Sequence, residues 1–330
     1  MKFRKIASLV LPVIIVFFTM YSCINKGSSH KDPEVVAKIE KEFVKKEEVN
    51  EYYSGLENGF IDQYGEDYKE SDDFKQIYLD LVNQYVEQRV LVQLAKDEGL
   101  VNESDIQEKV DEEFENMKSV FGNDEAFSTA IINSRFKDEE DYKSKLKISL
   151  IIEELIAKET ENLKVSNSEI ESYYKENSDK FVRGPGADVY HIFLNEESSA
   201  LKVLELLDSE EDFSKIAEIH SQDGSVSVGG YLGYQEFENS QLVEEFMEEV
   251  RDMEEGEVRG PVKTQFGYHI IKVENVNEEE WTEDLDRVSK NIEETLKAEK
   301  INEVMDSLIQ KAKDKYGVQV YEDNILGKKE

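Results

Sequence analysis

The sequence is poor in cysteine, proline and tryptophan, with one, four and one of each in 330 residues. A single cysteine cannot form a disulfide bridge within the chain, which excludes a disulfide-stabilised fold. Basic residues are also scarce, because 40 Lys and Arg face 75 Asp and Glu, for a net charge of −35. Charge of this sign and density repels nucleic acids and anionic lipid surfaces, so DNA or RNA binding is excluded as a main role. We interpret the acidic balance as a solvated surface rather than a cation-binding site.

Enough apolar residues remain to build folded domains. The apolar content is 39%, with 16 Tyr and 16 Phe, and a chain of this length allows two or three domains with their own cores. Metal ligands are few, since the chain has four histidines, no spare cysteine and no pair of histidines four residues apart. We therefore expect neither a metal site nor a cofactor.

The N-terminus has the features of a secretory signal. Three basic residues precede an apolar run of 15 residues, 6–20. A transmembrane helix needs about 20 residues, whereas the apolar core of a signal peptide is shorter. We predict a signal peptide over 1–22 and a polar tether over 23–33 that holds a domain away from a membrane. Removal of the signal takes the net charge from −35 to −38.

The residues around Cys23 resemble the lipobox of bacterial lipoproteins. Cys23 follows Ser22 at the end of the apolar run, although Met20 and Tyr21 depart from the usual leucine and small residue. The resemblance implies that Cys23 is lipidated and becomes the first residue, with the protein anchored at the outer face of the cytoplasmic membrane or in the periplasm. The alternative is an uncleaved anchor with an incidental cysteine. Both alternatives place the rest of the chain outside the cytoplasm.

Helical periodicity dominates residues 34–182. Apolar side chains recur three, four or seven residues apart from Phe74 onward, and Gly99 is a stop signal. Further helices are predicted from Ser104 and over roughly 139–163. The chain returns to helix between Thr282 and Tyr316, with an apolar stripe along it. The members of this stripe are Leu285, Val288, Ile292, Leu296, Val304 and Leu308.

The C-terminal stripe must be buried against another element, and the N-terminal helices are its natural partner. We therefore predict that residues 277–330 pack on a helical domain over 34–182. The stretch between them is then an insertion, which begins after an RGPG linker at 183–187. Short strands and helices alternate in the inserted segment.

Two strands of the insertion each carry a histidine inside an apolar sequence. His191 in VYHIFL and His269 in GYHIIKV both follow tyrosine and precede isoleucine. Three explanations are open for such a histidine: a structural core residue, a metal ligand, or part of a site that needs a neutral polar group. A neutral imidazole suits the last, because one nitrogen donates while the other accepts.

The motifs between and around these histidines resemble the parvulin-type peptidyl-prolyl isomerases. In order over 188–276 they are H-I-x-L, D-F-x-x-x-A, S-x-D, G-G-x-L-G, L-x-x-x-F, G-E-x-x-x-P-V and T-x-F-G-Y-H-I-I. The resemblance implies an α+β fold, with a helical N- and C-terminal chaperone domain and an inserted parvulin domain of a small antiparallel or mixed sheet flanked by helices. It also implies catalysis of cis-trans isomerisation at X-Pro bonds.

The resemblance assigns catalytic roles to four polar residues. His191 and His269 form a paired-histidine floor, Thr264 is bonded to it, and Asp223 holds a position that carries Cys or Asp in the family. The alternatives are that the histidines only orient the sheet and that Asp223 caps a turn before Gly224.

Four apolar residues are implied for substrate binding. Leu232, Leu242 and Phe246 line a slot for the proline ring, and Phe266 adds an apolar wall. Taken singly, the first three are equally well explained as core residues. The segment after the first histidine is NEESSA, so its acidic residues disfavour phosphorylated substrates, and ordinary X-Pro segments are expected.

The whole chain resembles extracytoplasmic foldases of the PrsA and SurA kind. EVVAKIEKEFVKKEEVNEYY is similar to their opening strand, turn and helix, although the usual turn glycine is missing. The resemblance implies an isomerase and chaperone that helps secreted or envelope proteins fold after translocation. Its partners are then unfolded or partly folded secreted polypeptides with X-Pro bonds, and both monomer and homodimer are open.

Two other functions are weighed against this one. The first is a holding chaperone with a catalytically silent parvulin scaffold, because Tyr231 replaces the usual aspartate of G-G-D-L-G. The second, an acidic surface adhesin or receptor, explains the anchor and the charge but not the ordered motifs.

Overall fold

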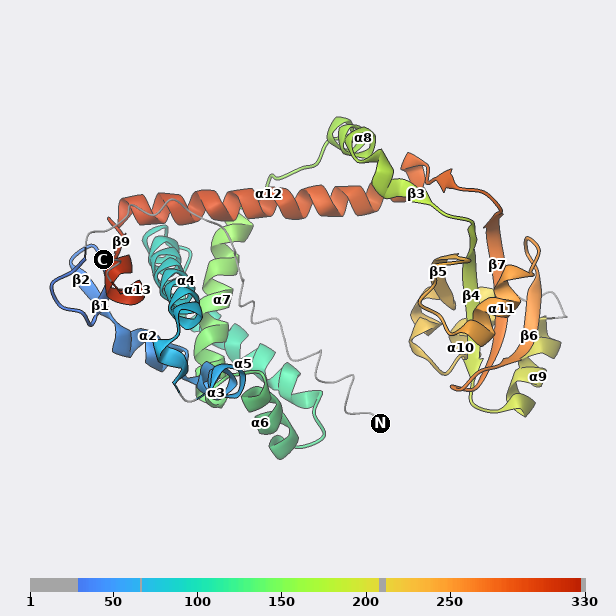
Figure 1. Cartoon of the computed structure of the whole chain (residues 1–330), viewed down its shortest axis with the longest axis horizontal. Helices are drawn as coiled ribbons and strands as arrows, with labels where there is room; N and C mark the ends of the chain where they lie inside the picture. Colours follow the sequence, from blue (N-terminus) through green and yellow to red (C-terminus); the bar gives the residue numbers. More distant parts are fainter. Residues whose placement is uncertain (1–28, 66, 208–211, 328–330) are drawn as a thin grey trace. The chain divides into compact units, whose positions relative to one another are not determined.

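The computed structural model describes residues 29–65, 67–207 and 212–327. The predicted signal peptide and Cys23 lie outside these residues. The chain divides into two compact units (Figure 1). The first combines the chain up to Lys164 with the residues from Lys297 onward, and the second is Val165–Leu296. No helix among the described residues has both the length and the apolar sequence that crossing a bilayer requires.

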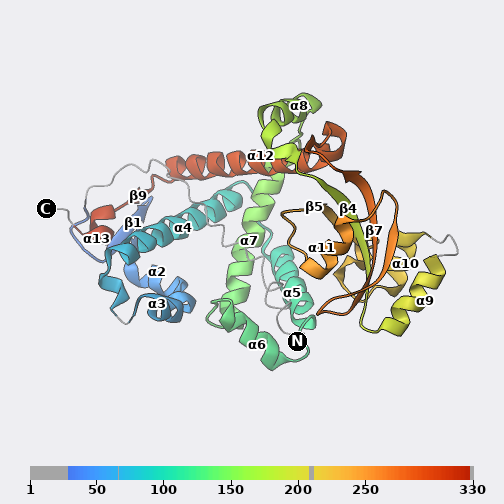
Figure 2. The same ribbon diagram turned by 45° about the vertical axis from the view of Figure 1, so that its right-hand side comes forward.

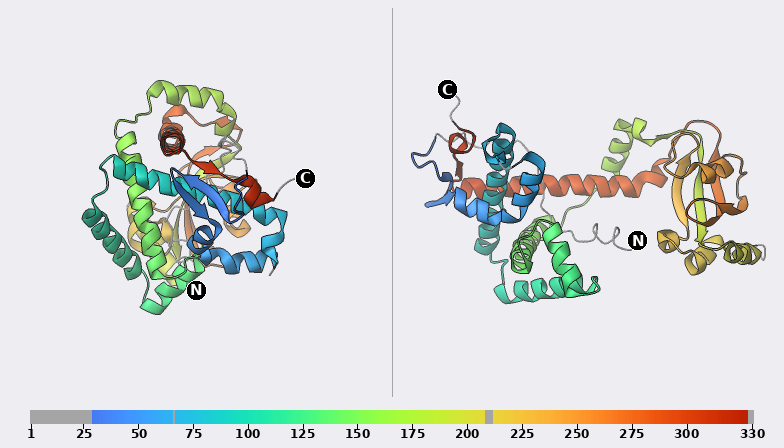
Figure 3. Two further views of the ribbon diagram at one scale, coloured as in Figure 1. Left: turned by 90° about the vertical axis from the view of Figure 1, so that its left-hand side faces the viewer. Right: turned by 60° about the horizontal axis from the view of Figure 1, so that its bottom comes forward.

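The first unit is mainly helical and contains a three-stranded antiparallel sheet in the order β2-β1-β9. Strands from the two ends of the chain therefore pair directly, as the blue and red strands in the left panel of Figure 3 show. The elements are β1 Val35–Ile39, β2 Glu42–Lys45, α2 Lys46–Tyr52, α3 Glu57–Tyr64, α4 Asp72–Asp97, α5 Glu103–Ser119, α6 Asp124–Asn133, α7 Glu139–Thr160, β9 Gln319–Val320, α13 Glu322–Leu326 and the C-terminal part of α12, Leu285–Lys315.

The predicted helices of this unit are confirmed, with small shifts at their ends. Ser71 caps α4 by accepting a hydrogen bond from the backbone N–H of Phe74, as its place before an apolar run predicts. Helix α5 starts one residue before Ser104, and α7 ends three residues before the predicted end. Helix α6 and strand β9 were not predicted, because each is short.

Two apolar cores hold the first unit together. One gathers α5, α6, α7, the second half of α4 and the end of α12, and it includes Met305, Leu308 and Tyr316. The other lies between the sheet, α2, α13 and the first half of α4. The end of α12 is therefore buried among helices from the first half of the chain.

The apolar stripe of α12 divides between the two units. Val304 and Leu308 pack in the first unit, whereas Val288 and Ile292 form a separate core with Ile170 and other residues of the second. Residues 165–182 and 277–296 consequently group with the second unit, although composition placed the boundary near 183. The RGPG stretch marks the start of a strand, and it does not mark the point at which side-chain contacts change.

The second unit contains an antiparallel four-stranded sheet in the order β5-β4-β7-β6 and a two-stranded sheet of β3 and β8. Its elements are α8 Asn167–Glu176, β3 Val182–Arg183, β4 Gly186–Leu194, α9 Glu197–Leu207, α10 Phe213–His220, the 3₁₀ helix η4 Gly224–Val228, β5 Tyr231–Glu236, α11 Glu244–Arg251, β6 Val258–Lys263, β7 Tyr268–Asn277, β8 Trp281–Thr282 and the N-terminal part of α12.

Helices cover both faces of the four-stranded sheet (Figure 2). Alternate residues of β4 and β7 point to opposite faces. Val189 and Ile271 pack under α11, whereas Ile192 and Ile270 pack under α9 and α10. Both central strands are consequently apolar on both faces, which explains their nearly continuous apolar sequence.

The turn between β1 and β2 places Glu40 in a left-handed conformation, with φ of 52°. This is the turn that lacks its usual glycine. A side chain with a Cβ costs about 1–2 kcal/mol in this region of backbone space. Glu40 is exposed, so no side-chain packing offsets that cost.

We expect Glu40→Gly to raise the free energy of unfolding of the first unit by up to ~1 kcal/mol, since glycine adopts positive φ without strain but loses more entropy on folding. Urea unfolding followed by far-UV ellipticity measures the change. Lys41→Gly, in the same turn but without a positive φ, should lower stability instead. A loss of stability in Glu40→Gly would contradict the strain argument.

Candidate functional site

The sheet brings the two histidines together on one face. In the β4–β7 register His191 lies opposite Ile271 and His269 lies opposite Phe193, so the two histidines are diagonal neighbours. Their Nδ1 atoms are 3.1 Å apart and the rings are nearly parallel, with centroids at 5.3 Å. Both side chains are buried, at 7% and 6% exposure.

The outer nitrogen of each ring has a partner. Nε2 of His191 lies 3.0 Å from Oδ2 of Asp223, and Nε2 of His269 lies 2.9 Å from Oγ1 of Thr264. The backbone N–H of Phe266 donates to the same Oγ1 at 3.2 Å. All four predicted catalytic residues therefore belong to one hydrogen-bonded chain.

The two ends of the chain determine the direction of its hydrogen bonds. Thr264 accepts from the backbone N–H of Phe266, and its hydroxyl proton remains available to donate to Nε2 of a neutral His269. At the other end an ionised carboxylate only accepts, so Nε2 of His191 carries a proton for Asp223. The remaining proton lies on Nδ1 of His269 and is donated to Nδ1 of His191. All four ring nitrogens are satisfied in this arrangement.

The pKa shifts agree with neutral imidazole and ionised carboxylate. Burial, together with the nearby His191, lowers the pKa of His269 to about 4. Burial would raise the pKa of Asp223, but hydrogen bonds from Ser221, Ser225 and His191 outweigh it and hold the pKa at about 2. His269 therefore stays uncharged and Asp223 stays charged at neutral pH.

Asp223 is both a helix cap and a hydrogen-bond partner of His191. It caps η4 by accepting from the backbone N–H of Ser225, and it also accepts from His191. The hydroxyls of Ser221 and Ser225 donate to Oδ1 at 2.7 and 2.8 Å. Ser221 belongs to the S-x-D motif, but no site role was predicted for it or for Ser225; their symmetric spacing around Asp223 in SQDGS was the available signal.

Two glycines allow the backbone to approach the site. Gly230 has φ of 83°, and a Cβ there would lie 2.3 Å from the carbonyl oxygen of His191. Gly267 has φ of 153°, and a Cβ there would lie 2.7 Å from the carbonyl oxygen of Leu194. The turn at Gly267 is closed by the N–H of Thr264, which holds that residue beside His269.

An apolar cluster lies against the paired histidines. Phe246 of α11 is 2% exposed and presents its ring roughly edge-to-face to both imidazoles, at centroid distances of 5.3 Å to His269 and 6.0 Å to His191. Leu232 and Leu242 are half-buried and pack against the same core. Phe266 is not part of this cluster, since its side chain is 64% exposed.

Tyr231 lies on the opposite face of the sheet. Its hydroxyl donates to Asp188 at 2.7 Å, and its ring contacts Tyr190 at 4.9 Å. Asp188 is 3% exposed and also accepts from Asn275 and Arg287. Burial, reinforced by Asp188, raises the pKa of Tyr231, so its hydroxyl remains a donor. The departure from G-G-D-L-G therefore alters the anchoring of β4 and leaves the histidine face unchanged.

Comparisons with known proteins match a protein family to each of the two units. Residues 165–290 match the family of PPIC-type PPIase domains, and residues 2–156 match that of SurA-like N-terminal domains. Foldase protein PrsA of Clostridium botulinum (strain Loch Maree / Type A3) is 30% identical over 98% of this chain and 98% of its own length. The same protein of strain Okra / Type B1 is 31% identical with the same coverage. This chain belongs to the PrsA foldase family.

Solved structures are also similar to this PrsA-family chain. The crystal structure of PrsA from Bacillus subtilis has 25% identity and a TM-score of 0.39, covering 87% of this chain and 92% of that one. The solution structure of NmPin, the parvulin of Nitrosopumilus maritimus, has 36% identity and a TM-score of 0.26, covering 28% of this chain and 99% of that one.

The family membership establishes the function in outline. This PrsA-family protein is a parvulin-type peptidyl-prolyl cis-trans isomerase and a chaperone, and unfolded polypeptides are its substrates. Within the described ranges, His, Cys, Asp and Glu side chains do not gather in threes in a way that would hold a metal ion.

Stability of the second unit should depend on the pH at which His269 is protonated. Below pH 6.5 the unfolded chain binds a proton that the folded unit takes up only near pH 4, so the free energy of unfolding falls over this interval. We expect a loss of roughly 1–3 kcal/mol, with solvent screening reducing the upper value. Fluorescence of Trp281, the only tryptophan, follows urea unfolding of this unit. An equally steep fall in His269→Gln would exclude His269 as the cause.

Tyr231→Phe should separate anchoring from catalysis. The variant removes a hydrogen bond to a buried carboxylate, which should lower the free energy of unfolding of the second unit by about 1–2 kcal/mol. Its kcat/KM for a prolyl peptide should stay within about twofold of the wild type, because the hydroxyl lies on the other face of the sheet. Trp281 fluorescence and a protease-free isomerisation assay measure the two quantities. A large loss of activity in a folded variant would place Tyr231 at the site.

Proposed function

We propose that this protein isomerises X-Pro bonds without a covalent intermediate, in a slot formed by Leu232, Leu242 and Phe246 above the paired histidines. The observation that supports this site is the packing of one buried phenyl ring against both imidazoles. When a substrate proline enters the slot, these side chains replace water around its imide bond.

Desolvation lowers the barrier to rotation about this bond. Resonance stabilises the planar imide, and the barrier of about 20 kcal/mol makes the uncatalysed reaction slow. The planar state is more polar than the twisted state, so removing water destabilises the planar state more. Catalysis then comes from tighter binding of the twisted state.

The closed hydrogen-bond chain has a direct part in this mechanism. Because the four ring nitrogens of His191 and His269 are occupied by one another, Asp223 and Thr264, the floor offers no free imidazole donor to the planar imide carbonyl. A floor of neutral rings with satisfied polar atoms is a less polar environment than water. The role of Thr264 and Asp223 is thus to occupy the outer ring nitrogens and to orient both histidines.

The substrates we propose are ordinary X-Pro segments of unfolded proteins. Glu196 and Glu197 are exposed beside the end of β4, where they repel a phosphate group. Phe266, exposed at the turn that carries Thr264, is available to contact a bound segment. We further propose that lipidated Cys23 anchors the protein outside the cytoplasm, where secreted or envelope proteins fold after translocation.

Phe246→Ala should weaken isomerisation more than Asp223→Ala. Removing the phenyl group opens the slot to water, and the lost apolar contact of roughly 1.5–3 kcal/mol corresponds to a fall in kcat/KM of about 10- to 100-fold. Asp223→Ala alters only the partner of His191, and we expect a fall of less than about tenfold. A protease-free assay on a short X-Pro peptide, with the chain from residue 24 at several salt concentrations, measures both.

Met247→Ala is the matched control, because it removes a buried side chain from the same helix and the same core. Its kcat/KM should stay close to that of the wild type once Trp281 fluorescence shows that it is folded. Equal losses in Phe246→Ala and Asp223→Ala would count against desolvation. No catalysis by folded protein that still suppresses aggregation would instead indicate a holding chaperone.

A further inference from the structure

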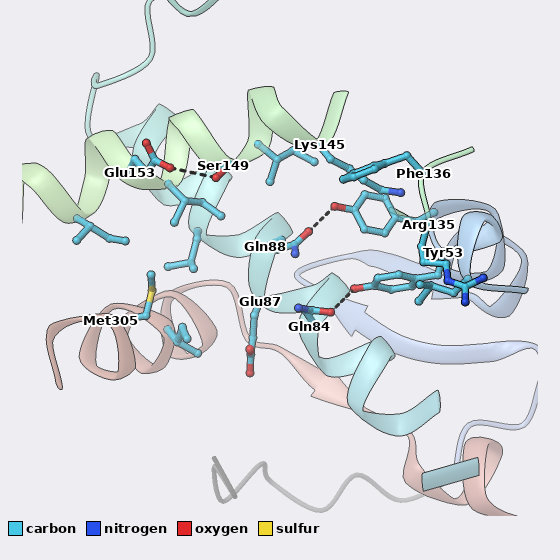
Figure 4. A pocket seen from close by; sticks show the side chains of 17 residues that line it. Tyr53, Gln84, Glu87, Gln88, Arg135, Phe136, Lys145, Ser149, Glu153 and Met305 are labelled. Carbon is cyan, nitrogen blue, oxygen red and sulfur yellow. Dashed lines mark hydrogen bonds between the residues drawn. The ribbon is translucent and has the colours of Figure 1, made fainter. Parts of the chain in front are cut away.

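A pocket in the first unit takes no part in the isomerase site (Figure 4). Helices α2, α4, α7 and α12 and the segment after α6 supply its walls. More than half of its lining residues are aliphatic or aromatic, although these helices already bury other apolar faces in the two cores. Part of the apolar lining is therefore additional to the buried residues that form the two cores of this unit.

Helix α7 shows this excess most clearly. Leu146, Leu150 and Leu155 of α7 are buried in the core. Ile148, Ile152 and Ile156, four residues apart, form a second apolar row that is only half-buried and lines the pocket. A helix with two apolar faces requires a partner on each. The described part of the first unit covers the second face incompletely.

The aromatic side of the pocket has a fixed polar pattern. The hydroxyl of Tyr52 donates to Oε1 of Gln88 at 2.5 Å, and that of Tyr53 donates to Oε1 of Gln84 at 2.9 Å. Because the amide oxygen of Gln88 is already occupied, its NH₂ group is the part that can bind a ligand, and it has no partner among the described residues. An amide donor beside apolar walls suits a peptide carbonyl.

Arg135 supplies a positive charge at the pocket, whose lining also includes Glu87, paired with Lys313, and Glu153. Its φ is 70°, in the left-handed position that ends α6 and that usually carries glycine. Its guanidinium forms no ion pair or hydrogen bond with any described side chain. Lys145, the other basic residue of the lining, already pairs with Asp141 at 2.8 Å. A strained arginine without an internal partner is consistent with binding an external acidic group.

We propose that this pocket binds an extended apolar segment of an unfolded polypeptide, with an acidic residue beside its apolar side chains and no need for proline. The isoleucine row and the tyrosines contact the apolar side chains, Gln88 binds a carbonyl of the segment, and Arg135 pairs with its acidic residue. The inference rests on the chaperone part of the function and names the site that performs it.

Fluorescence anisotropy of a short labelled peptide tests the pocket, using the chain from residue 24, which keeps every described residue. The probe contains leucine, phenylalanine and one aspartate but no proline. We expect Ile152→Gln to weaken binding about tenfold, from lost apolar contact. Ile132→Gln is the matched control, because Ile132 is an exposed isoleucine of α6 outside the pocket, at 58% exposure. Equal binding by Ile152→Gln and wild type would overturn the proposal.

Arg135→Gly provides a second test that does not depend on Ile152→Gln folding. Glycine suits the left-handed backbone, so the thermal midpoint should be unchanged or raised. Binding of the aspartate peptide should fall about two- to fivefold, as for an exposed ion pair, while binding of an asparagine version should not change. Equal losses for both peptides would show that the guanidinium does not recognise the acid.

Isomerase activity separates this proposal from the proposed isomerase mechanism. Ile152→Gln and Arg135→Gly should keep the wild-type kcat/KM, and Phe246→Ala should keep its affinity for the proline-free peptide. Loss of peptide binding in Phe246→Ala would place the binding site in the isomerase unit and overturn the proposal. A dimer in sedimentation that Ile152→Gln abolishes would also overturn it, since a second copy would then occupy the pocket.

Discussion

Two nitrogen atoms, Nδ1 of His191 and Nδ1 of His269, lie 3.1 Å apart in a buried position, so one must donate and the other must accept. This condition excludes the state in which both rings are doubly protonated, because two N–H groups would then face each other. Asp223 and Thr264 select the ring tautomers from opposite ends of the hydrogen-bond chain. The register of β4 and β7 places the two rings side by side. The cap of η4 positions Asp223, and the tight turn before β7 positions Thr264.

The same contact makes the floor of the site less polar than its composition indicates. Four polar side chains satisfy one another, and the phenyl ring of Phe246 packs over the result. A buried polar network of this kind is stable only when every member is paired. The arrangement suits a reaction whose barrier falls when water leaves the substrate, because no strong donor competes for the planar imide.

The two units handle an unfolded chain by different physical means. In the mechanism we propose, the second unit binds a proline of the unfolded chain and excludes water from its imide bond. The first unit has a half-covered pocket whose lining is mostly apolar, with several polar side chains among the apolar ones. Two positions of the first unit have a positive φ without being glycine: Arg135 lines the pocket for which we propose polypeptide binding, whereas Glu40 lies in an exposed turn.

Motifs and periodicity along the sequence determined the family of this protein and most of its helices. Ordered motifs identified the isomerase unit and the four polar residues that the structure joins in one hydrogen-bonded chain, and helical periodicity located α4, α5 and α7, because both depend on local spacing. Only the tertiary structure decided that Tyr231 lies on the far face of the sheet, that Phe266 lies at the surface, that the stripe of α12 serves two cores, and that α2, α4, α7 and α12 form a pocket. These features arise from contacts between residues far apart in the sequence, and such contacts leave no periodic or motif signal along the chain.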